Sequence, residues 1–138
     1  MVEGDAQGSS RASSVGGKAR HRWSREIENV AFRVDDFDAR ATVIWRKRNE
    51  MVIRRGATLR SDIPLNKDGT IGFDVRCGTQ IRAEHRNAVK DFTTTDDIVL
   101  RSVNEVGLFL YFGRTNGWLV LRDDDGRTIH DWTVVPEC

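Results

Sequence analysis

Residues 41–54 read ATVIWRKRNEMVIR, two short runs of apolar, largely β-branched side chains with a basic and polar stretch between them. Runs of this length on either side of a polar turn are typical of two strands joined as a hairpin. The alternative is a single helix that begins at Asp38, an acceptable N-cap, and ends at Gly56, an acceptable residue after the last turn. That helix would place Lys47 and Arg48 on the face that needs apolar side chains, so the stretch favours a hairpin.

Shorter alternating runs continue on both sides of this hairpin. Upstream, residues 30–34 alternate and end at the Asp35-Asp36 pair, and downstream residues 71–77 alternate most regularly of all. Alternation with a period of two residues indicates a strand with one buried face. Further strands are expected, in chain order, over 80–83, 98–103, 106–112, 118–121 and 128–135. Asn116-Gly117 and Asp125-Gly126, which separate the last three, are typical of hairpin turns.

The turns between these runs recur at a spacing of roughly 8–12 residues, which is typical of an antiparallel sandwich or barrel. Residues 84–96 show no sustained period and fit a loop with room for one helical turn. No strand–helix–strand alternation is evident, which argues against a parallel nucleotide-binding sheet. We therefore predict an all-β fold, an antiparallel β-sandwich or jelly-roll-like domain of about eight strands.

The first 22 residues, MVEGDAQGSSRASSVGGKARHR, differ in composition from the rest of the chain. They are mostly Gly, Ser, Ala and Arg, with no aromatic side chain. Such a segment cannot bury enough apolar surface to offset the entropy lost on ordering. At 138 residues the chain is expected to form one domain. We predict a flexible basic arm over 1–22, either an ordinary disordered leader or a phosphate-binding arm, and a single all-β domain over 23–138.

The location of the protein is predicted from what the sequence lacks. Cys77 and Cys138 are too few and too far apart for a disulfide framework. No apolar stretch approaches the roughly 20 residues needed to span a bilayer, and the N-terminus has no signal-peptide pattern. We expect an intracellular, soluble protein, with a virion as a second possible location.

Few residues are suited to catalysis or to metal binding. Cys77 should point into the core, where a thiol is unreactive, and His130 should be a partly buried strand residue beside Trp132. The acidic turn Asp123-Asp124-Asp125-Gly126 does not fit a calcium loop, because its acids are adjacent and no glutamate follows at the required distance. We therefore expect no enzyme, cofactor or metal site. A less favoured hypothesis is an enzyme that uses His85 in the 84–96 loop.

Charge is distributed unevenly along this nearly neutral chain. Residues 11–60 contain thirteen basic and six acidic side chains, a net charge of +7, whereas residues 91–138 have a net charge of −5. A local positive field attracts polyanions even when the whole protein is close to neutral. The leading hypothesis is therefore a non-enzymatic protein that binds phosphates of RNA or single-stranded DNA without strong sequence preference.

Two segments supply the residues that we expect to contact phosphate, the end of the arm and the predicted hairpin. The candidate nucleic-acid-binding residues are Arg20, Arg22, Arg25, Trp45, Arg46, Lys47, Arg48, Arg54 and Arg55. The basic ones would contact phosphates, and Trp45 would stack on a base if its ring is exposed. The competing interpretations are that Trp45 belongs to the core and that the arginines pair with the acidic turns.

Two other partners remain possible. The basic and acidic parts of the chain could attract each other between copies, so self-association, as in small viral coat proteins, is plausible. The alternative function is a β-sandwich module that binds a carbohydrate, lipid or protein through its end loops, with Trp118 as the contact. The fragments 60–62, 69–74 and 115–118 resemble short motifs of the aegerolysins, which are lipid-binding β-sandwich proteins. The intervals between the fragments do not match that family, so the resemblance only keeps lipid among the possible ligands.

Overall fold

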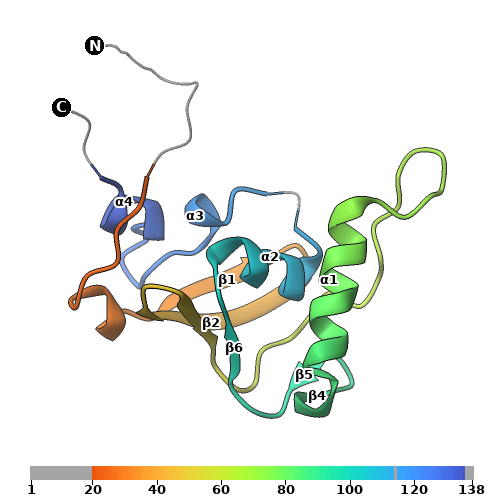
Figure 1. Ribbon diagram of the computed structural model, residues 1–138, viewed down its shortest axis with the longest axis horizontal. Coiled ribbons are helices and arrows are strands. Elements are labelled where there is room, and N and C mark those ends of the chain that lie inside the picture. Colours follow the sequence, from red (N-terminus) through yellow and green to blue (C-terminus); the bar gives the residue numbers. More distant parts are fainter. Residues whose placement is uncertain (1–19, 114, 136–138) are drawn as a thin grey trace.

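The computed structural model describes residues 20–113 and 115–135, and in this part of the chain the predicted all-β fold is wrong. The fold is mixed α/β, with 31% helix and 26% strand, and it is neither a β-sandwich nor a jelly roll. Figure 1 shows one main sheet with α2 in front of it and α1 standing beside it. The predicted arm over 1–22 lies outside the described residues except for its last three positions.

The main sheet contains the hairpin that the sequence predicts. Its four antiparallel strands lie in the order β1-β2-β3-β6. Their bounds are Phe32–Asp36 (β1), Ala39–Lys47 (β2), Glu50–Ile53 (β3) and Ile98–Leu100 (β6). A second, two-stranded sheet joins Val89–Lys90 (β4) and Thr93–Thr94 (β5), within the segment expected to be a loop. The strands predicted over 30–34, 41–48 and 51–54 are thus confirmed to within a few residues.

One face of the main sheet forms the core. In β2 the side chains of Val43 and Trp45 are buried, while Arg40 and Arg46 on the other face are exposed. The same alternation is present in β1, where Phe32 and Val34 are buried. These side chains pack in one cluster with α2 residues, including Val106, Phe109 and Leu110. The opposite face of the sheet is largely open to solvent.

Helices occupy most of the remaining stretches for which strands were predicted. The α-helices span Phe73–Glu84 (α1), Val103–Tyr111 (α2), Gly117–Val120 (α3) and Ile129–Thr133 (α4). Two short 3₁₀ helices span Ile27–Asn29 (η1) and Arg86–Ala88 (η2). The strands predicted over 71–77, 80–83, 106–112, 118–121 and 128–135 are therefore wrong.

In α1 the regular alternation of residues 71–77 does not correspond to burial. Phe73 is 71% exposed and Ile71 is exposed as well, whereas Val75 and Gly78 are buried. Burial at positions 75 and 78, three residues apart, is the spacing of one helix face. Gly78, which resembles a turn residue in the sequence, lies where α1 packs against α2.

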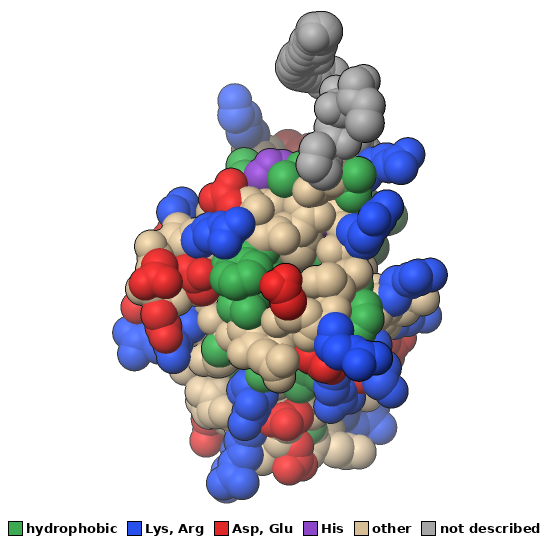
Figure 2. Space-filling model, turned by 90° about the vertical axis from the view of Figure 1, so that its left-hand side faces the viewer, with side chains coloured by type: hydrophobic (Ala, Val, Ile, Leu, Met, Phe, Trp, Pro, Cys, Tyr) green, Lys and Arg blue, Asp and Glu red, His purple; other side chains and the backbone are tan. Residues whose placement is uncertain are grey.

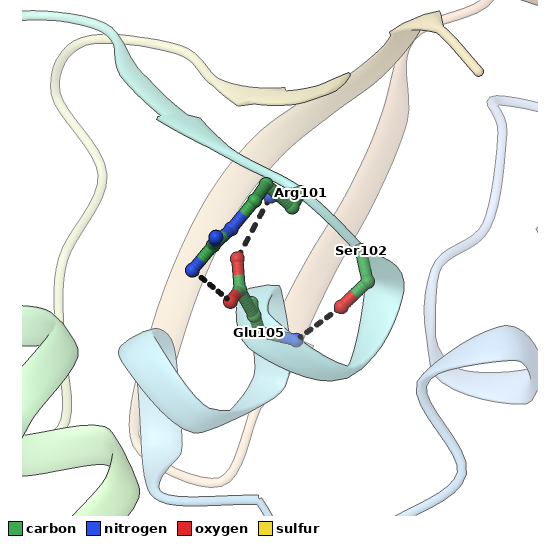
Figure 3. Close-up of polar contacts among 3 residues, drawn as sticks. All are labelled: Arg101, Ser102 and Glu105. Atoms are coloured by element: carbon green, nitrogen blue, oxygen red, sulfur yellow. Dashed lines mark hydrogen bonds and ion pairs between the residues drawn. The ribbon is translucent and has the colours of Figure 1, made fainter. Parts of the chain in front are cut away.

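The helix α2 begins at a Ser-x-x-Glu sequence that caps it. The Ser102 hydroxyl accepts a hydrogen bond from the Glu105 backbone N–H at 3.2 Å. The Glu105 carboxylate accepts one from the Arg101 N–H at 2.8 Å and lies 3.4 Å from the Arg101 guanidinium. Figure 1 shows α2 in front of the sheet and α4 at its left, and Figure 2 views the molecule from the side that carries α4. Figure 3 shows the three residues of the α2 cap.

We expect Ser102→Ala to lower the free energy of unfolding by about 1 kcal/mol, because an N–H in the first turn of α2 loses its partner. Urea titration followed by circular dichroism measures this change. Ser61→Ala, at an exposed position outside any helix, is the matched control and should change stability by less than about 0.5 kcal/mol. Equal stability of the two variants would contradict the capping role.

The two short helices begin in the same way. Thr128 and Asp131 form a reciprocal capping box, with the Asp131 N–H donating to the Thr128 hydroxyl at 3.0 Å. Before α3, the Asn116 side chain accepts from the Trp118 N–H at 3.1 Å. Asn, Ser and Thr favour both turns and helix N-caps, because their short side chains bond to nearby backbone groups. That ambiguity accounts for the strands wrongly predicted at 118–121 and 128–135.

Candidate functional site

The predicted site residues come from three separate parts of the chain. Arg20, Arg22 and Arg25 precede or adjoin η1; Trp45, Arg46 and Lys47 end β2; Arg48 lies in the turn, and Arg54 and Arg55 follow β3. Among the described residues, Arg46 and Arg54 each have a carboxylate partner, whereas the side chains of the other predicted basic residues have none.

Two indole hydrogen bonds hold the segment before η1 against the β2–β3 turn. Trp23 Nε1 donates to the Trp45 carbonyl oxygen at 2.9 Å. Trp45 Nε1 in turn donates to the Arg48 carbonyl oxygen at 3.2 Å. The residues on both sides of Trp23 are therefore brought to the turn that carries Lys47 and Arg48.

We name the four basic residues at this junction, Arg22, Arg25, Lys47 and Arg48, the basic patch. All four are exposed. Among the described residues, none of the four side chains lies within 4.0 Å of a carboxylate. The strand register shifts between Trp45 and Lys47, so Lys47 is exposed although Trp45, two residues earlier, is buried. The patch can therefore bind an anion without first breaking an ion pair.

Arg46 and Arg54 differ from the patch because each has an acidic partner. Arg46 Nε forms an ion pair with Glu50, and this contact holds the pKa of the Glu50 carboxyl below its usual value. Arg54 Nε lies 3.9 Å from Asp97 Oδ1, which also accepts the Arg55 backbone N–H at 2.8 Å. On the open face of the sheet the positive charge is thus largely balanced.

Two further arginines on this face were not among the predicted site residues. Arg33 pairs with Asp124, and Arg40 Nε lies 3.4 Å from Asp35 Oδ1. Together with Arg54 and Arg55 they line a shallow hollow of about 300 Å³. Arg33 and Arg40 alternate with buried side chains along β1 and β2, so the sequence pattern could have placed both on the open face of the sheet.

Trp45, the predicted stacking residue, is only 6% exposed and belongs to the core, so its ring offers no surface for a base.

His85, the candidate of the enzyme hypothesis, follows the last turn of α1, and its ring lies edge-on to that of Phe109 with the ring centroids 6.0 Å apart. The acidic turn is also satisfied internally, since Asp123 accepts the Trp132 indole N–H at 2.8 Å and two backbone N–H groups. These hydrogen bonds, of which the one from Trp132 has the largest effect, hold the pKa of Asp123 below its usual value.

Residues 20–23, which we name the strap, run beside the end of the chain. The Arg22 N–H donates to the Thr133 carbonyl and the Val135 N–H to the Arg20 carbonyl, both at 2.8 Å. The His21 ring stacks on Trp118, with ring centroids 3.6 Å apart and planes 3° from parallel. One ring nitrogen of His21 lies 2.9 Å from Nδ1 of His130. The strap therefore covers the Trp118 ring that the alternative hypothesis used as a contact.

Burial and the neighbouring His130 lower the pKa of His21 from 6.5 to about 4. Because the folded pKa is the lower one, the docked strap is fully stabilised above pH 6.5. As the pH falls from 6.5 toward 4, the equilibrium constant for docking of the strap decreases by up to tenfold per pH unit. We expect an NMR titration of the His21 imidazole to give a midpoint near 4, with the Trp118 indole signal changing in the same window. A midpoint near 6.5 for His21 would contradict the docked position.

Figure 2 faces the end of the molecule that carries the strap and the β2–β3 turn, with basic side chains along its right-hand edge. Acidic side chains gather mainly toward the left and lower parts of the same view. Within the described residues, no three His, Cys, Asp or Glu side chains are grouped so that they could hold a metal ion. Nor is any described helix both long and apolar enough to cross a membrane.

The comparisons with known proteins identify no relative. Neither the protein-family models, nor the curated proteins, nor the solved structures give a match to this chain. The basic patch and the strap are therefore interpreted from their own geometry.

Proposed function

We propose that this protein binds phosphates of RNA or single-stranded DNA, without strong sequence preference, through the basic patch Arg22, Arg25, Lys47 and Arg48. The observation that carries the proposal is that two indole hydrogen bonds hold the segment of Arg22 and Arg25 against the turn of Lys47 and Arg48. All four cations are exposed and have no acidic partner among the described residues. Arg20 and Arg55, which are exposed and have no carboxylate partner among the described residues, are further candidates for phosphate contact. Arg46 and Arg54 are engaged by Glu50 and Asp97 and contribute less.

Ion pairing explains why the patch, and not the open sheet face, is the better phosphate site. An arginine such as Arg46 weakens its exposed ion pair with Glu50 when it binds a phosphate, and this loss, although modest, offsets part of the gain. Unpaired cations have no such cost, and their mutual repulsion falls when an anion binds. Each phosphate that they neutralise also releases condensed counterions from the nucleic acid, which makes binding strongly dependent on salt.

The proposal requires no catalytic step and no cofactor, and it places the protein where nucleic acid is present, inside a cell or a virion. Self-association is part of it as a secondary element. Asp125, the exposed acid of the turn whose side chain has no partner among the described residues, could contact the basic patch of another copy, and several weak patches acting together would bind a long strand more tightly. A sizing column run with and without nucleic acid measures this.

We expect binding to fluorescein-labelled oligo(dT) and to an RNA of equal length to weaken steeply between about 50 and 200 mM salt. Arg25→Gln should lower the slope of log K against log salt by about 0.7, because one phosphate contact is lost. It should weaken the binding of oligo(dT) and of the RNA by the same factor. Fluorescence anisotropy measures both quantities. Arg76→Gln, an exposed arginine on α1, is the control and should leave the slope unchanged. Binding that does not depend on salt would overturn the proposal.

A further inference from the structure

The contact between His21 and Trp118 has the geometry of a bound base. A planar nitrogen heterocycle lies parallel to the indole, with ring centroids 3.6 Å apart and planes 3° from parallel. Aromatic side chains in single-strand binding proteins stack on bases in this way, and any base can take part because each has a flat π-face. The imidazole of His21 therefore occupies a position on Trp118 that a nucleobase could fill.

A polar group lies at the edge of the same position. His130 Nδ1 is 2.9 Å from the His21 ring nitrogen. A neutral histidine nitrogen donates or accepts a hydrogen bond according to its tautomer. It can therefore bond to a ring nitrogen, an amino group or a carbonyl of different bases, which fits binding without strong sequence preference.

The Trp118 ring is also held by contacts that do not involve His21. The Trp45 ring meets it edge-on, with ring centroids 5.4 Å apart, and Trp45 is itself fixed by its bond to the Arg48 carbonyl. Asn116 caps the N-terminus of α3 by accepting the Trp118 N–H. The stacking surface should therefore keep its position when His21 leaves it.

His21 can leave more easily than a core residue can. Its ring is only partly buried, and two backbone hydrogen bonds flank it, those of Arg22 with Thr133 and of Val135 with Arg20. The indole bond of Trp23 can hold the next part of the strap at the β2–β3 turn while the His21 ring leaves. Among the described residues, the titratable group that faces His21 from another element is His130 on α4, and the other ring in contact with it, Trp118, is uncharged. No carboxylate of the described residues lies within 4.0 Å of the His21 ring to hold it there in its charged form.

We propose that the face of Trp118 is a stacking site for a nucleobase of single-stranded nucleic acid, and that His21 blocks it from within the same chain. This inference rests on the proposed function, because the basic patch would hold the phosphates that flank the base. Arg22 follows His21 directly in the sequence, and the Arg48 carbonyl is bonded to the Trp45 ring, which contacts the Trp118 ring. A strand bound at the patch displaces His21 and places one base between Trp118 and the edge of His130.

The test compares oligo(dT) with an abasic strand of the same length and charge. His21→Ala should bind oligo(dT) about tenfold more tightly than the wild type does, within the range that stacking of one base supplies. Its affinity for the abasic strand should not increase. Adding Trp118→Leu to His21→Ala should remove the gain. Tryptophan fluorescence should be quenched more by oligo(dT) in His21→Ala than in the wild type.

A second measurement uses the wild type alone, so that the test does not depend on the folding of a variant. As the pH falls from 7 to 5 the strap weakens, and the preference for oligo(dT) over the abasic strand should widen. If the ratio of the affinities for oligo(dT) and the abasic strand were the same in the wild type and both variants, and at both pH values, the stacking site would be overturned. Phosphate binding would not be affected by that result. Absence of salt-dependent binding to either strand would instead overturn the proposed function.

Discussion

Gly78→Val should destabilise the protein by about 3 kcal/mol or more and lower its Tm by roughly 10 to 20 °C. A Cβ at this position would lie 2.5 Å from the Leu108 carbonyl oxygen and 3.0 Å from Cδ1 of Phe112. The oxygen belongs to the backbone of α2 and cannot rotate away, so α1 and α2 would have to separate. That separation would open the contact that joins α1 to the rest of the core. Thermal unfolding followed by circular dichroism measures the loss.

Thr79→Val is the matched control, because Thr79 is the next residue of α1 and is exposed. It introduces the same β-branched side chain into the same helix without the contact to α2, and its effect should stay within about 0.5 kcal/mol. If Gly78→Val were as stable as Thr79→Val, the close approach of the two helices would be contradicted.

Arg82→Met should lower the free energy of unfolding by about 3 kcal/mol. The Arg82 guanidinium donates to the carbonyls of Phe109 at 2.8 Å and Leu110 at 3.1 Å, near the C-terminus of α2. A third bond reaches the Arg60 carbonyl at 2.9 Å, and the group lies 4.1 Å from the centre of the Phe112 ring. Burial lowers the pKa of Arg82 to about 10, so the group keeps its charge at neutral pH.

The large effect is expected because methionine fills the space but donates no hydrogen bond. Carbonyls at the end of α2 would lose a charged donor at the negative end of the helix dipole. Arg76→Met makes the same change at an exposed position of α1 and should cost less than about 0.5 kcal/mol. Urea titration separates the two variants, and equal midpoints would contradict the role given to Arg82.

The sheet could be predicted from the sequence because its strands follow a simple rule. In β2 each buried side chain alternates with an exposed or half-buried one, so period-2 alternation and burial agree. The helices could not be separated from strands by the same rule. In α2 every residue from Val106 to Tyr111 is buried, and a continuous apolar run has no period that distinguishes helix from strand.

Local cap sequences held the information that the apolar pattern lacked. Ser102 with Glu105, and Thr128 with Asp131, have the three-residue spacing of a capping box. Weighing them would have favoured helices for α2 and α4. In α1 the decisive residue, Gly78, is small because another helix passes close by, and that reason cannot be read from the sequence of α1 alone.

The basic candidate residues could be named from the sequence, but their ion pairing and the segments that lie beside them could not. Whether an arginine is paired depends on residues far along the chain, as with Arg54 and Asp97 or Arg33 and Asp124. The patch itself depends on one long-range bond, from the Trp23 indole to the Trp45 carbonyl. The burial of Trp45 follows from its place on the core face of β2, which the strand alternation already favoured.

The central claim is that unpaired cations at the β2–β3 turn bind phosphate, and a comparison of two double variants tests it most directly. Lys47→Gln/Arg48→Gln and Arg46→Gln/Arg54→Gln each remove two positive charges, the first pair from the patch and the second from ion pairs. The measurement is the slope of log K against log salt for oligo(dT) between about 50 and 200 mM salt. We expect the first variant to lower the slope by about 1.4 and the second to leave it close to that of the wild type. Equal losses in the two variants, or no salt dependence in the wild type, would contradict the claim.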